Sequence, residues 1–311
     1  MKFSSNPARV LTTCLLFILA VIFSCKKETS QSLTQQDEQQ ANMAATESDA
    51  EADGVFNGFF DDVMGVNTDV GMGGTGLFMR TNAAGFGPVG SDARTDPAPP
   101  CLVVTIVTSG SSSSPFPITV TMDFGAGCTC GDGHVRKGKI VARYSDRLLH
   151  PHATANIQFN NFSIDSIQLD NSTSFTISNT GTADRLQLTI DVSAKLNKPN
   201  GNYTEWHSQK VITRIGGGDT TTPLDDVMQI EGSTSGTVKR NDLAVAWKAE
   251  ITNPFIKRFT CRWISQGTIK VGRESLSSNS QWIGTLDYGN GICDNQATLT
   301  LNGVTYQITL H

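Results

Sequence analysis

Three short segments carry residue types that are used in catalysis, and each can be compared with the pattern that its chemistry needs. Residues 232–236 (Gly-Ser-Thr-Ser-Gly) are similar to a nucleophile elbow, but the central residue is Thr234 and the surroundings alternate like a strand. His150 and His152 form a close histidine pair without an adjacent third metal ligand. Residues 71–76 are glycine-rich but lack the Gly-Lys-Ser/Thr ending of a phosphate loop. We therefore expect no catalytic residue, metal site or cofactor, and a protein that is not an enzyme.

Cys25 is the residue whose surroundings predict a definite chemical modification. Residues 1–24 contain two basic residues and no acidic one, with an apolar run over 15–23 and a serine directly before the cysteine. This pattern is typical of a secretory signal peptide, and the run is too short to span a bilayer comfortably. The Ser24-Cys25 junction resembles the lipobox of bacterial lipoproteins, in which the thiol carries fatty acids such as palmitate. The alternative is a plain cleaved signal whose cysteine has another fate.

The remaining cysteines indicate disulfides. Cys14 leaves with the signal and Cys25 is expected to be acylated, so five remain: Cys101, Cys128, Cys130, Cys261 and Cys293. Export permits disulfides, and these residues fall into two local sets. We favour Cys101–Cys128 and Cys261–Cys293, with Cys130 unpaired, although spacing alone does not fix the connectivity. A zinc site is the competing interpretation, but Cys128 and Cys130 form a C-x-C pair with no matching pair downstream.

One motif occurs twice. Residues 121–128 and 285–293 both read Thr-x-Asp-aromatic-Gly-x-Gly with a cysteine just after. The structural interpretation is a strand that ends in a glycine-permitted turn, whose cysteine links it to a neighbour. The alternative is calcium binding by Asp123 and Asp287. Calcium prefers about six to eight oxygen ligands, and each motif supplies one carboxylate plus one nearby, so we favour the turn.

The charge is unevenly distributed along the chain. The whole chain has a net charge of −5, and residues 25–98 contain twelve acidic and four basic residues. Residues 99–311 are close to neutral. Binding of nucleic acid needs a concentrated basic face, which this sequence lacks. No cluster of lysine and arginine suits anionic lipid head groups either, so membrane contact is expected through the acyl chains on Cys25.

Residues 25–47 are rich in polar residues without apolar periodicity, and we expect a flexible tether there. The capping-box pattern over 48–51 (Ser-Asp-Ala-Glu) predicts the start of a short helix, and Gly65 a natural end. Its apolar residues recur at helical spacing: Val55, Phe56, Phe59, Phe60, Val63 and Met64. We expect this helix to pack on the body, with a partner-binding or membrane-lying helix as the alternative. Its acidic residues disfavour an anionic membrane surface.

Residues 48–100 thus comprise the short helix followed by a glycine- and proline-rich loop, and strands begin at Cys101. Apolar and polar residues alternate over 186–196, 243–251 and 304–310, which is typical of antiparallel strands with one buried face. Asn302-Gly303 predicts a hairpin turn. Residues 101–311 are therefore expected to be one all-β domain, either a large antiparallel meander or a sandwich.

An exposed tryptophan would suggest a binding surface. Trp247 and Trp263 share parity with apolar neighbours, which predicts core positions. Trp206 shares its face with Thr204, Ser208 and Lys210, so it is a candidate for ligand contact together with Tyr203 and His207. The alternative is a Trp206 that the helix or a loop covers.

Four segments carry a family resemblance: 123–125 (Asp-Phe-Gly), 136–140 (Arg-Lys-Gly-Lys-Ile), 261–263 (Cys-Arg-Trp) and 286–291 (Leu-Asp-Tyr-Gly-Asn-Gly). From residue 101 to 310 the chain resembles a family of uncharacterised lipoproteins from polysaccharide-degrading, gliding Gram-negative bacteria. The family has no established activity, so the resemblance implies location and a similar fold. In many surface lipoproteins of such bacteria a lysine and acidic residues follow the lipidated cysteine, and residues 26–28 (Lys-Lys-Glu) match this signal in part.

The sequence therefore predicts an outer-membrane lipoprotein with a non-catalytic β-rich domain that binds or scaffolds at the cell envelope. The expected partners are the membrane, through the anchor on Cys25, and a glycan or another envelope protein. Cell-surface display is favoured over a periplasm-facing position. A periplasm-facing structural or assembly lipoprotein is the first alternative, and a glycan-active enzyme the second.

Overall fold

The chain divides into two compact units, Met1–Asp37 and Glu38–His311, and the description below concerns the second. A computed structural model describes residues 35–65, 99–111, 115–218, 225–274 and 284–310. The predicted signal peptide, Cys25 and most of the glycine-rich loop lie outside the described residues, so those predictions stay predictions.

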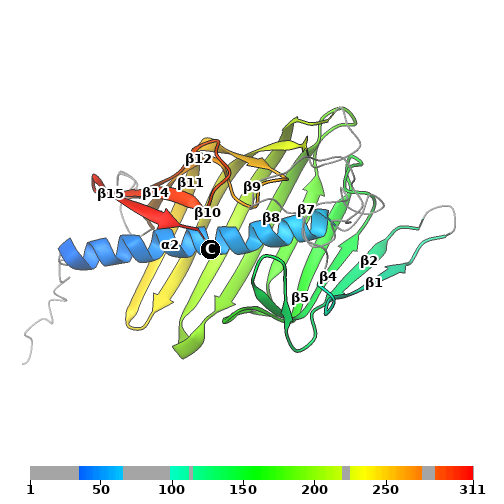
Figure 1. Cartoon of the computed structure of the whole chain (residues 1–311), viewed down its shortest axis with the longest axis horizontal. Coiled ribbons are helices and arrows are strands. Elements are labelled where there is room, and N and C mark those ends of the chain that lie inside the picture. The colour runs from blue at the N-terminus through cyan, green and yellow to red at the C-terminus, as the bar shows by residue number, and fades with distance from the viewer. Residues whose placement is uncertain (1–34, 66–98, 112–114, 219–224, 275–283, 311) are drawn as a thin grey trace, which may run out of the picture. The chain divides into compact units, whose positions relative to one another are not determined.

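One antiparallel sheet of 15 strands makes up the body (Figure 1). Its order is β1-β2-β4-β5-β6-β8-β9-β10-β11-β12-β13-β14-β15, with β3 beside β4 and β7 between β5 and β8. The all-β prediction is confirmed, and the single sheet is a meander rather than a sandwich. The strands are β1 Val103–Thr108, β2 Ile118–Asp123, β3 Cys128–Thr129, β4 Val135–Tyr144, β5 Thr154–Ile164, β6 Ile167–Leu169, β7 Ser174–Asn179, β8 Gln187–Asn197, β9 Tyr203–Gly216, β10 Val227–Arg240, β11 Leu243–Arg258, β12 Gln266–Arg273, β13 Gly284–Asn290, β14 Gln296–Leu301 and β15 Val304–Thr309.

The alternating segments of the sequence form strands where they are expected, in β8, β11 and β15. Asn302 and Gly303 connect β14 to β15 with φ angles of 48° and 82°. Two consecutive positive φ values are those of the tight turn that matches the twist of a hairpin, so the predicted turn is confirmed. After residue 100 the described ranges contain no α-helix, and Pro199–Gly201 forms a short 3-10 turn.

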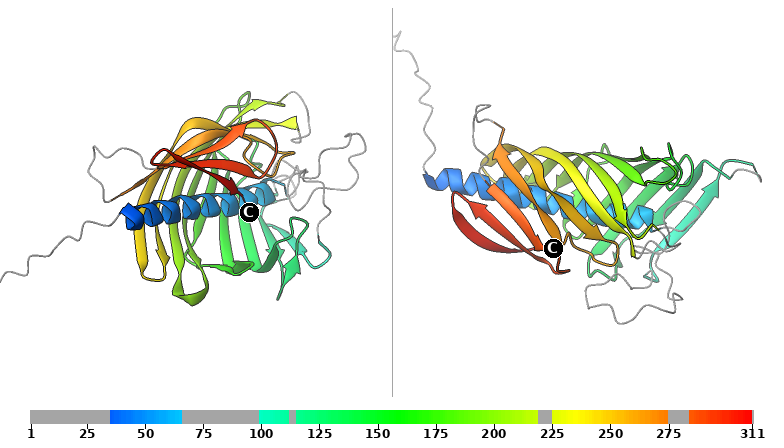
Figure 2. Two further views of the ribbon diagram at one scale, coloured as in Figure 1. Left: turned by 60° about the vertical axis from the view of Figure 1, so that its left-hand side comes forward. Right: turned by 90° about the horizontal axis from the view of Figure 1, so that it is seen from above.

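Helix α2 (Gln35–Met64) crosses the strands along one face of the curved sheet (Figure 2). The predicted start at 48 is wrong, and so is the predicted tether over 35–47, because the helix is already formed at Gln35. Alanines at helical spacing, Ala41, Ala44 and Ala45, are buried and anchor this early part. The predicted end is confirmed, since the amide of Gly65 donates to the carbonyl of Asp61 at 2.8 Å. Within the described ranges, no helix combines the length and apolar composition needed to cross a bilayer.

The helix and the sheet share one core built from aromatic side chains. Phe56 stacks on the indole of Trp206 with ring centroids 5.2 Å apart, and Phe59 lies 4.9 Å from Phe159. The hydroxyl of Tyr144 donates to the carbonyl of Val63 at 2.8 Å, which satisfies one free carbonyl at the helix end. Burying such rings contributes about 1.5–3 kcal/mol each, so this face fixes the helix on the sheet.

Both favoured disulfides are present. Cys101 is bonded to Cys128 and Cys261 to Cys293, while Cys130 is a buried free thiol. The repeated motif forms the expected turns. The carboxylate of Asp123 accepts from the amide of Gly125 at 2.9 Å, and that of Asp287 from the amide of Gly289 at 2.8 Å. Each carboxylate therefore closes its own turn, which supports the structural interpretation over calcium.

Candidate functional site

The face of α2 that contacts the sheet carries a buried carboxylate. One oxygen of Asp49 accepts hydrogen bonds from the indole nitrogens of Trp206 at 2.9 Å and Trp247 at 3.2 Å, and from the Thr234 hydroxyl at 2.5 Å. Burial raises the pKa of Asp49, although the three donors act in the opposite direction. Gly236 makes room for this arrangement, because a Cβ there would lie 2.6 Å from the Trp247 ring.

Ion pairs join the rest of this helix face to the sheet. Asp53 pairs with Lys210 of β9 inside the core, and Asp61 lies 3.0 Å from the ammonium of Lys257 on β11. The sequence analysis did not assign a direction to the acidic residues of the helix. Asp53 and Asp61 face the sheet, where basic side chains on the strands neutralise them. The helix is therefore positioned by charge as well as by apolar packing.

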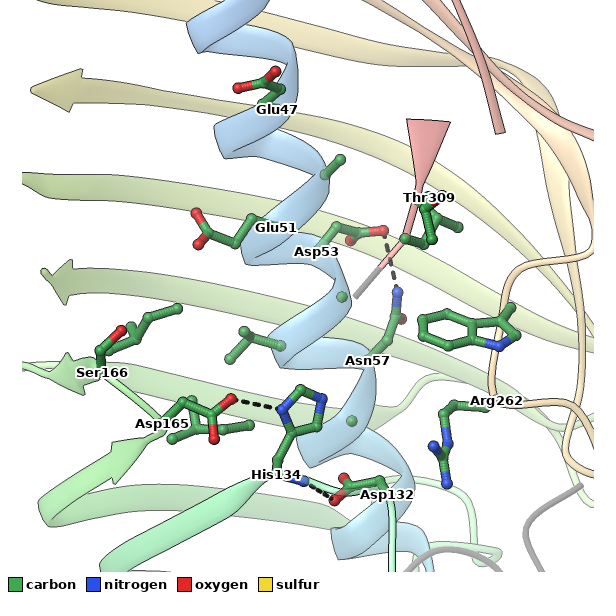
Figure 3. A pocket seen from close by; sticks show the side chains of 18 of the residues that line it. Glu47, Glu51, Asp53, Asn57, Asp132, His134, Asp165, Ser166, Arg262 and Thr309 are labelled. Atoms are coloured by element: carbon green, nitrogen blue, oxygen red, sulfur yellow. Dashed lines mark hydrogen bonds and ion pairs between the residues drawn. The ribbon is translucent and has the colours of Figure 1, made fainter. Parts of the chain in front are cut away.

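The opposite face of α2 is the floor of a cleft of about 600 Å³, which we call the helix cleft (Figure 3). Small residues one turn apart, Ala50, Gly54 and Gly58, form the middle of this floor, so the backbone of the helix is accessible there. A Cβ placed at Gly58 would meet no atom within 4 Å. This volume lies within the range of small-molecule sites.

Segments far apart in the sequence form the walls. One side is made by 131–134 and 164–167, and the other by 262–264, Tyr288 and 308–310. Figure 3 shows Asp165 and Ser166 on one side of the helix and Arg262 and Thr309 on the other. The C-terminal strand reaches the helix directly, since the amide nitrogen of the Gln39 side chain donates to the hydroxyl of Tyr306 at 2.9 Å.

Two ion pairs close one end of the helix cleft. Arg240 of β10 lies 2.6 Å from Glu47, and its other terminal nitrogen donates to the Ser48 hydroxyl at 3.3 Å. Lys198 pairs with Glu51. In each of these partly exposed pairs, the two side chains neutralise each other. They therefore form the rim of the helix cleft and leave no unpaired charge there for a ligand.

A histidine and two carboxylates face the other end. The Nδ1 of His134 lies 2.7 Å from Asp165, and Arg136 forms two bonds of 2.9 and 2.7 Å with Asp132. Burial acts to raise the pKa of Asp132 and Asp165, but the donors around them outweigh it and hold both pKa values below the ordinary range. Glycosidic hydrolysis by paired carboxylates needs one that stays protonated near neutral pH. Neither Asp132 nor Asp165 suits that role.

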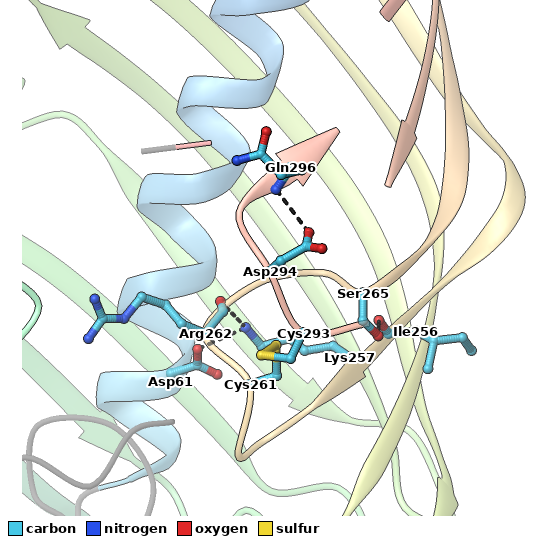
Figure 4. Close-up of a disulfide and its surroundings, with 9 residues drawn as sticks. All are labelled: Asp61, Ile256, Lys257, Cys261, Arg262, Ser265, Cys293, Asp294 and Gln296. Atoms are coloured by element: carbon cyan, nitrogen blue, oxygen red, sulfur yellow. Dashed lines mark hydrogen bonds and ion pairs between the residues drawn. A yellow bond between two sulfur atoms is a disulfide. The ribbon is translucent and has the colours of Figure 1, made fainter. Parts of the chain in front are cut away.

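The segment after Cys261 brings a cation and an aromatic ring to the helix cleft. Arg262 and Trp263 are half-buried and line it. Figure 4 shows the Arg262 side chain pointing away from the Cys261–Cys293 disulfide and across the helix. The Lys257 ammonium donates to the carbonyl of Arg262 at 3.3 Å, so the ion pair with the helix also fixes this segment.

The candidates taken from the sequence are not brought together. Trp206 is only 1% exposed and lies under the helix, so it is not an exposed ligand contact, and the alternative of a tryptophan covered by the helix is confirmed. His207 is exposed on the opposite face, as strand alternation requires. Tyr203 shares that outer face and packs under the Lys195 ammonium, 4.2 Å from the ring centroid. Trp263 was predicted to be core and instead lines the helix cleft, whereas Trp247 is buried as predicted.

Thr234 is buried and bonded to Asp49, which removes any resemblance to a nucleophile elbow. His150 lies in the turn between β4 and β5, 3.3 Å from Asp146. Across the described ranges, no group of three or more His, Cys, Asp or Glu side chains is placed to hold a metal ion.

Sequence reasoning missed His134, Asp165, Arg262 and the glycines of the floor as site residues. The spacing of Ala50, Gly54 and Gly58 could have indicated the floor of the helix cleft. Glycine in a helix interior costs about 1 kcal/mol, so two of them at this spacing indicate a packing or functional role.

No family model, curated protein or solved structure matches this chain.

Proposed function

We propose that this chain is an outer-membrane lipoprotein, anchored through an acylated Cys25, whose β-rich body binds a ligand in the helix cleft without transforming it. The helix cleft is the observation that carries the binding role. It is a preformed hollow in the size range of ligand sites, lined by aliphatic side chains and by charged side chains that mostly pair with one another. The signal-like segment before Cys25 supports the anchor.

The absence of catalysis is part of the proposal and rests on the chemistry of the cleft. The donors around Asp132 and Asp165 hold both pKa values below the ordinary range, so neither carboxyl suits the general acid that glycosidic hydrolysis needs. The second candidate function is a glycan-active enzyme, and the His134–Asp165 pair favours it, because an oriented imidazole is the usual general base. Hydrolysis of a polysaccharide by the purified protein, lost in His134→Gln, would support this second candidate against the first.

Acylation is tested by mass spectrometry of the protein purified from membranes, with Cys25→Ser as the comparison. We expect the mass of a diacylated N-terminal cysteine, and release of the Cys25→Ser protein into the soluble envelope fraction. An unmodified thiol on membrane-purified protein would contradict the anchor.

Orientation is a separate question, and we favour the cell surface over the periplasmic face. Protease added to intact cells should degrade a surface-exposed body. If the body resists until the outer membrane is broken, the periplasm-facing alternative, a structural or assembly lipoprotein, is correct.

Ligand binding is tested with the mature chain carrying Cys25→Ser, screened by thermal shift against lipid and glycan panels. A ligand of the helix cleft should raise the melting temperature of this chain and have no such effect on Gly58→Phe, whose side chain would fill the floor. Equal shifts in both proteins would place binding elsewhere.

A further inference from the structure

Between its charged residues, the helix cleft has a continuous set of aliphatic side chains. Branched apolar side chains from the helix, β5, β6, β15 and the segment after Cys261 line it: Val55, Ile164, Ile167, Ile264, Ile308 and Leu310. With the small residues of the floor, they form a surface that offers dispersion contacts and few hydrogen bonds. Such walls suit a hydrocarbon chain.

The helix cleft is also elongated. It follows α2 from Glu47 to Asp62, about 22 Å apart at the rise of an α-helix. A ligand that uses the whole length must be long and narrow rather than compact.

Most charges that line the helix cleft already have partners within the protein. Glu47, Glu51 and Asp132 pair with Arg240, Lys198 and Arg136 respectively, and Asp165 pairs with His134. Arg262 differs, because no carboxylate of the described residues lies within ion-pair distance of its guanidinium. An arginine in this position favours an anionic group with two oxygens, such as a carboxylate.

We propose, on the basis of the ligand-binding function above, that the helix cleft binds a single long-chain fatty acid. Its carboxylate pairs with Arg262 and its acyl chain lies along the glycine floor between the aliphatic walls. A glycan suits the site less well, because sugar hydroxyls need many free polar partners and several stacking rings. Here the polar side chains bond mainly to each other and Trp263 is the one tryptophan among the lining residues.

The test uses the mature chain with Cys25→Ser and the fluorescent fatty acid cis-parinarate, displaced by palmitate. We expect saturable binding that palmitate displaces. Arg262→Gln should raise the Kd about tenfold, because it removes a charge-assisted bond. Arg143→Gln is the matched control, since Arg143 is exposed on β4 outside the helix cleft and its loss changes the net charge equally. An Arg262→Gln effect no larger than that of Arg143→Gln would overturn the head-group assignment.

A second series tests the position of the acyl chain without endangering the fold. Binding should weaken progressively from Gly58→Ala to Gly58→Leu to Gly58→Phe, because the larger side chain fills more of the floor. Each variant should keep or raise the melting temperature, because glycine is the poorest of these helix formers. Unchanged palmitate binding in Gly58→Phe would overturn the proposal.

The same variants distinguish a failure of the fatty-acid inference from a failure of the proposed ligand-binding function. If palmitate fails to bind but a glycan or phosphatidylglycerol vesicles bind in a Gly58→Phe-sensitive manner, the fatty-acid inference is wrong and the helix cleft remains a binding site. If no lipid or glycan in the panels binds to the folded protein, both the inference and the proposed binding function are wrong.

Discussion

The indole nitrogen of Trp206 donates to the carboxylate of Asp49 at 2.9 Å, across 157 positions of sequence. The bond links the middle of the helix to the centre of the sheet. Trp247 on β11 reaches the same oxygen. Trp206, a candidate for ligand contact in the sequence analysis, therefore fastens the helix to the sheet.

Asp49→Ala should lower the free energy of unfolding by about 3 kcal/mol, because it leaves two buried indole N–H groups without an acceptor. Urea denaturation measures this. Asp191→Ala is the control, since Asp191 is exposed on β8, and it should change stability by less than about 0.5 kcal/mol. Equal effects of the two substitutions would show that the Asp49 bonds do not stabilise the fold.

The buried pair of Asp53 and Lys210 should show strong coupling. Lys210→Met alone should cost about 3–5 kcal/mol, since it leaves a carboxylate in the core, and adding Asp53→Leu should recover most of that loss. A double-mutant cycle in urea measures the coupling. The exposed pair of Lys195 and Glu205, 2.8 Å apart, is the control and should couple by less than about 1 kcal/mol. Weak coupling in both pairs would contradict the role of charge in positioning the helix.

Stability should depend on pH through Asp226. Burial raises the pKa of this carboxyl to about 6, with Asp225 adding to the rise and Arg214, 3.6 Å away, opposing it. Because the folded form holds the proton more tightly, this group lowers stability as pH rises from about 4 to about 6. Asp226→Asn should therefore be more stable than the parent above pH 6, by up to about 3 kcal/mol, with the difference vanishing below pH 4.

Chemical denaturation at a series of pH values tests this, with Asp184→Asn, at an exposed position, as the comparison. A stability difference for Asp226→Asn that does not change between pH 4 and 7 would disprove the prediction.

The two disulfides should differ in what they do. Replacing Cys261 and Cys293 by alanine opens a link across 32 positions and should cost about 3–4 kcal/mol. It should also weaken binding in the helix cleft, because Arg262 and Trp263 follow Cys261 directly. Replacing Cys101 and Cys128, a link across 27 positions, should cost a similar amount of stability and leave binding unchanged. Calorimetry gives both quantities, and equal binding in the two double variants would contradict the role of the Cys261 segment.

Much of the fold could be predicted because period-two alternation is a local signal. It located β8, β11 and β15, and the Asn302-Gly303 turn followed from its own dihedral requirement. The same signal fails for Trp206. Alternation shows that Trp206 and Lys210 share a face, but it does not show that this face is the covered one.

The helix start and the helix cleft were missed for related reasons. Hydrophobic periodicity treats Asp49 and Asp53 as polar residues and so does not assign them to the same helix face as Phe56. In the structure, all three are buried against the sheet. Their partners lie more than 150 positions away, on β9, β10 and β11. The cleft likewise depends on where the segment after Cys261 and the end of β15 arrive, which no local window contains.

The contacts of helix α2 are with strands that are synthesised long after it. Helix α2 is made before every strand of the sheet, yet it bonds to Trp247 and to Tyr306, which is 267 positions beyond Gln39. Its carboxylates cannot pair with Lys198, Lys210 and Lys257 until those later strands and turns have been made. Contacts between residues so far apart in the sequence slow folding. A chain truncated before β11 would lack the helix contacts made by Trp247, Lys257 and Tyr306, so the acidic helix would be more accessible to proteases.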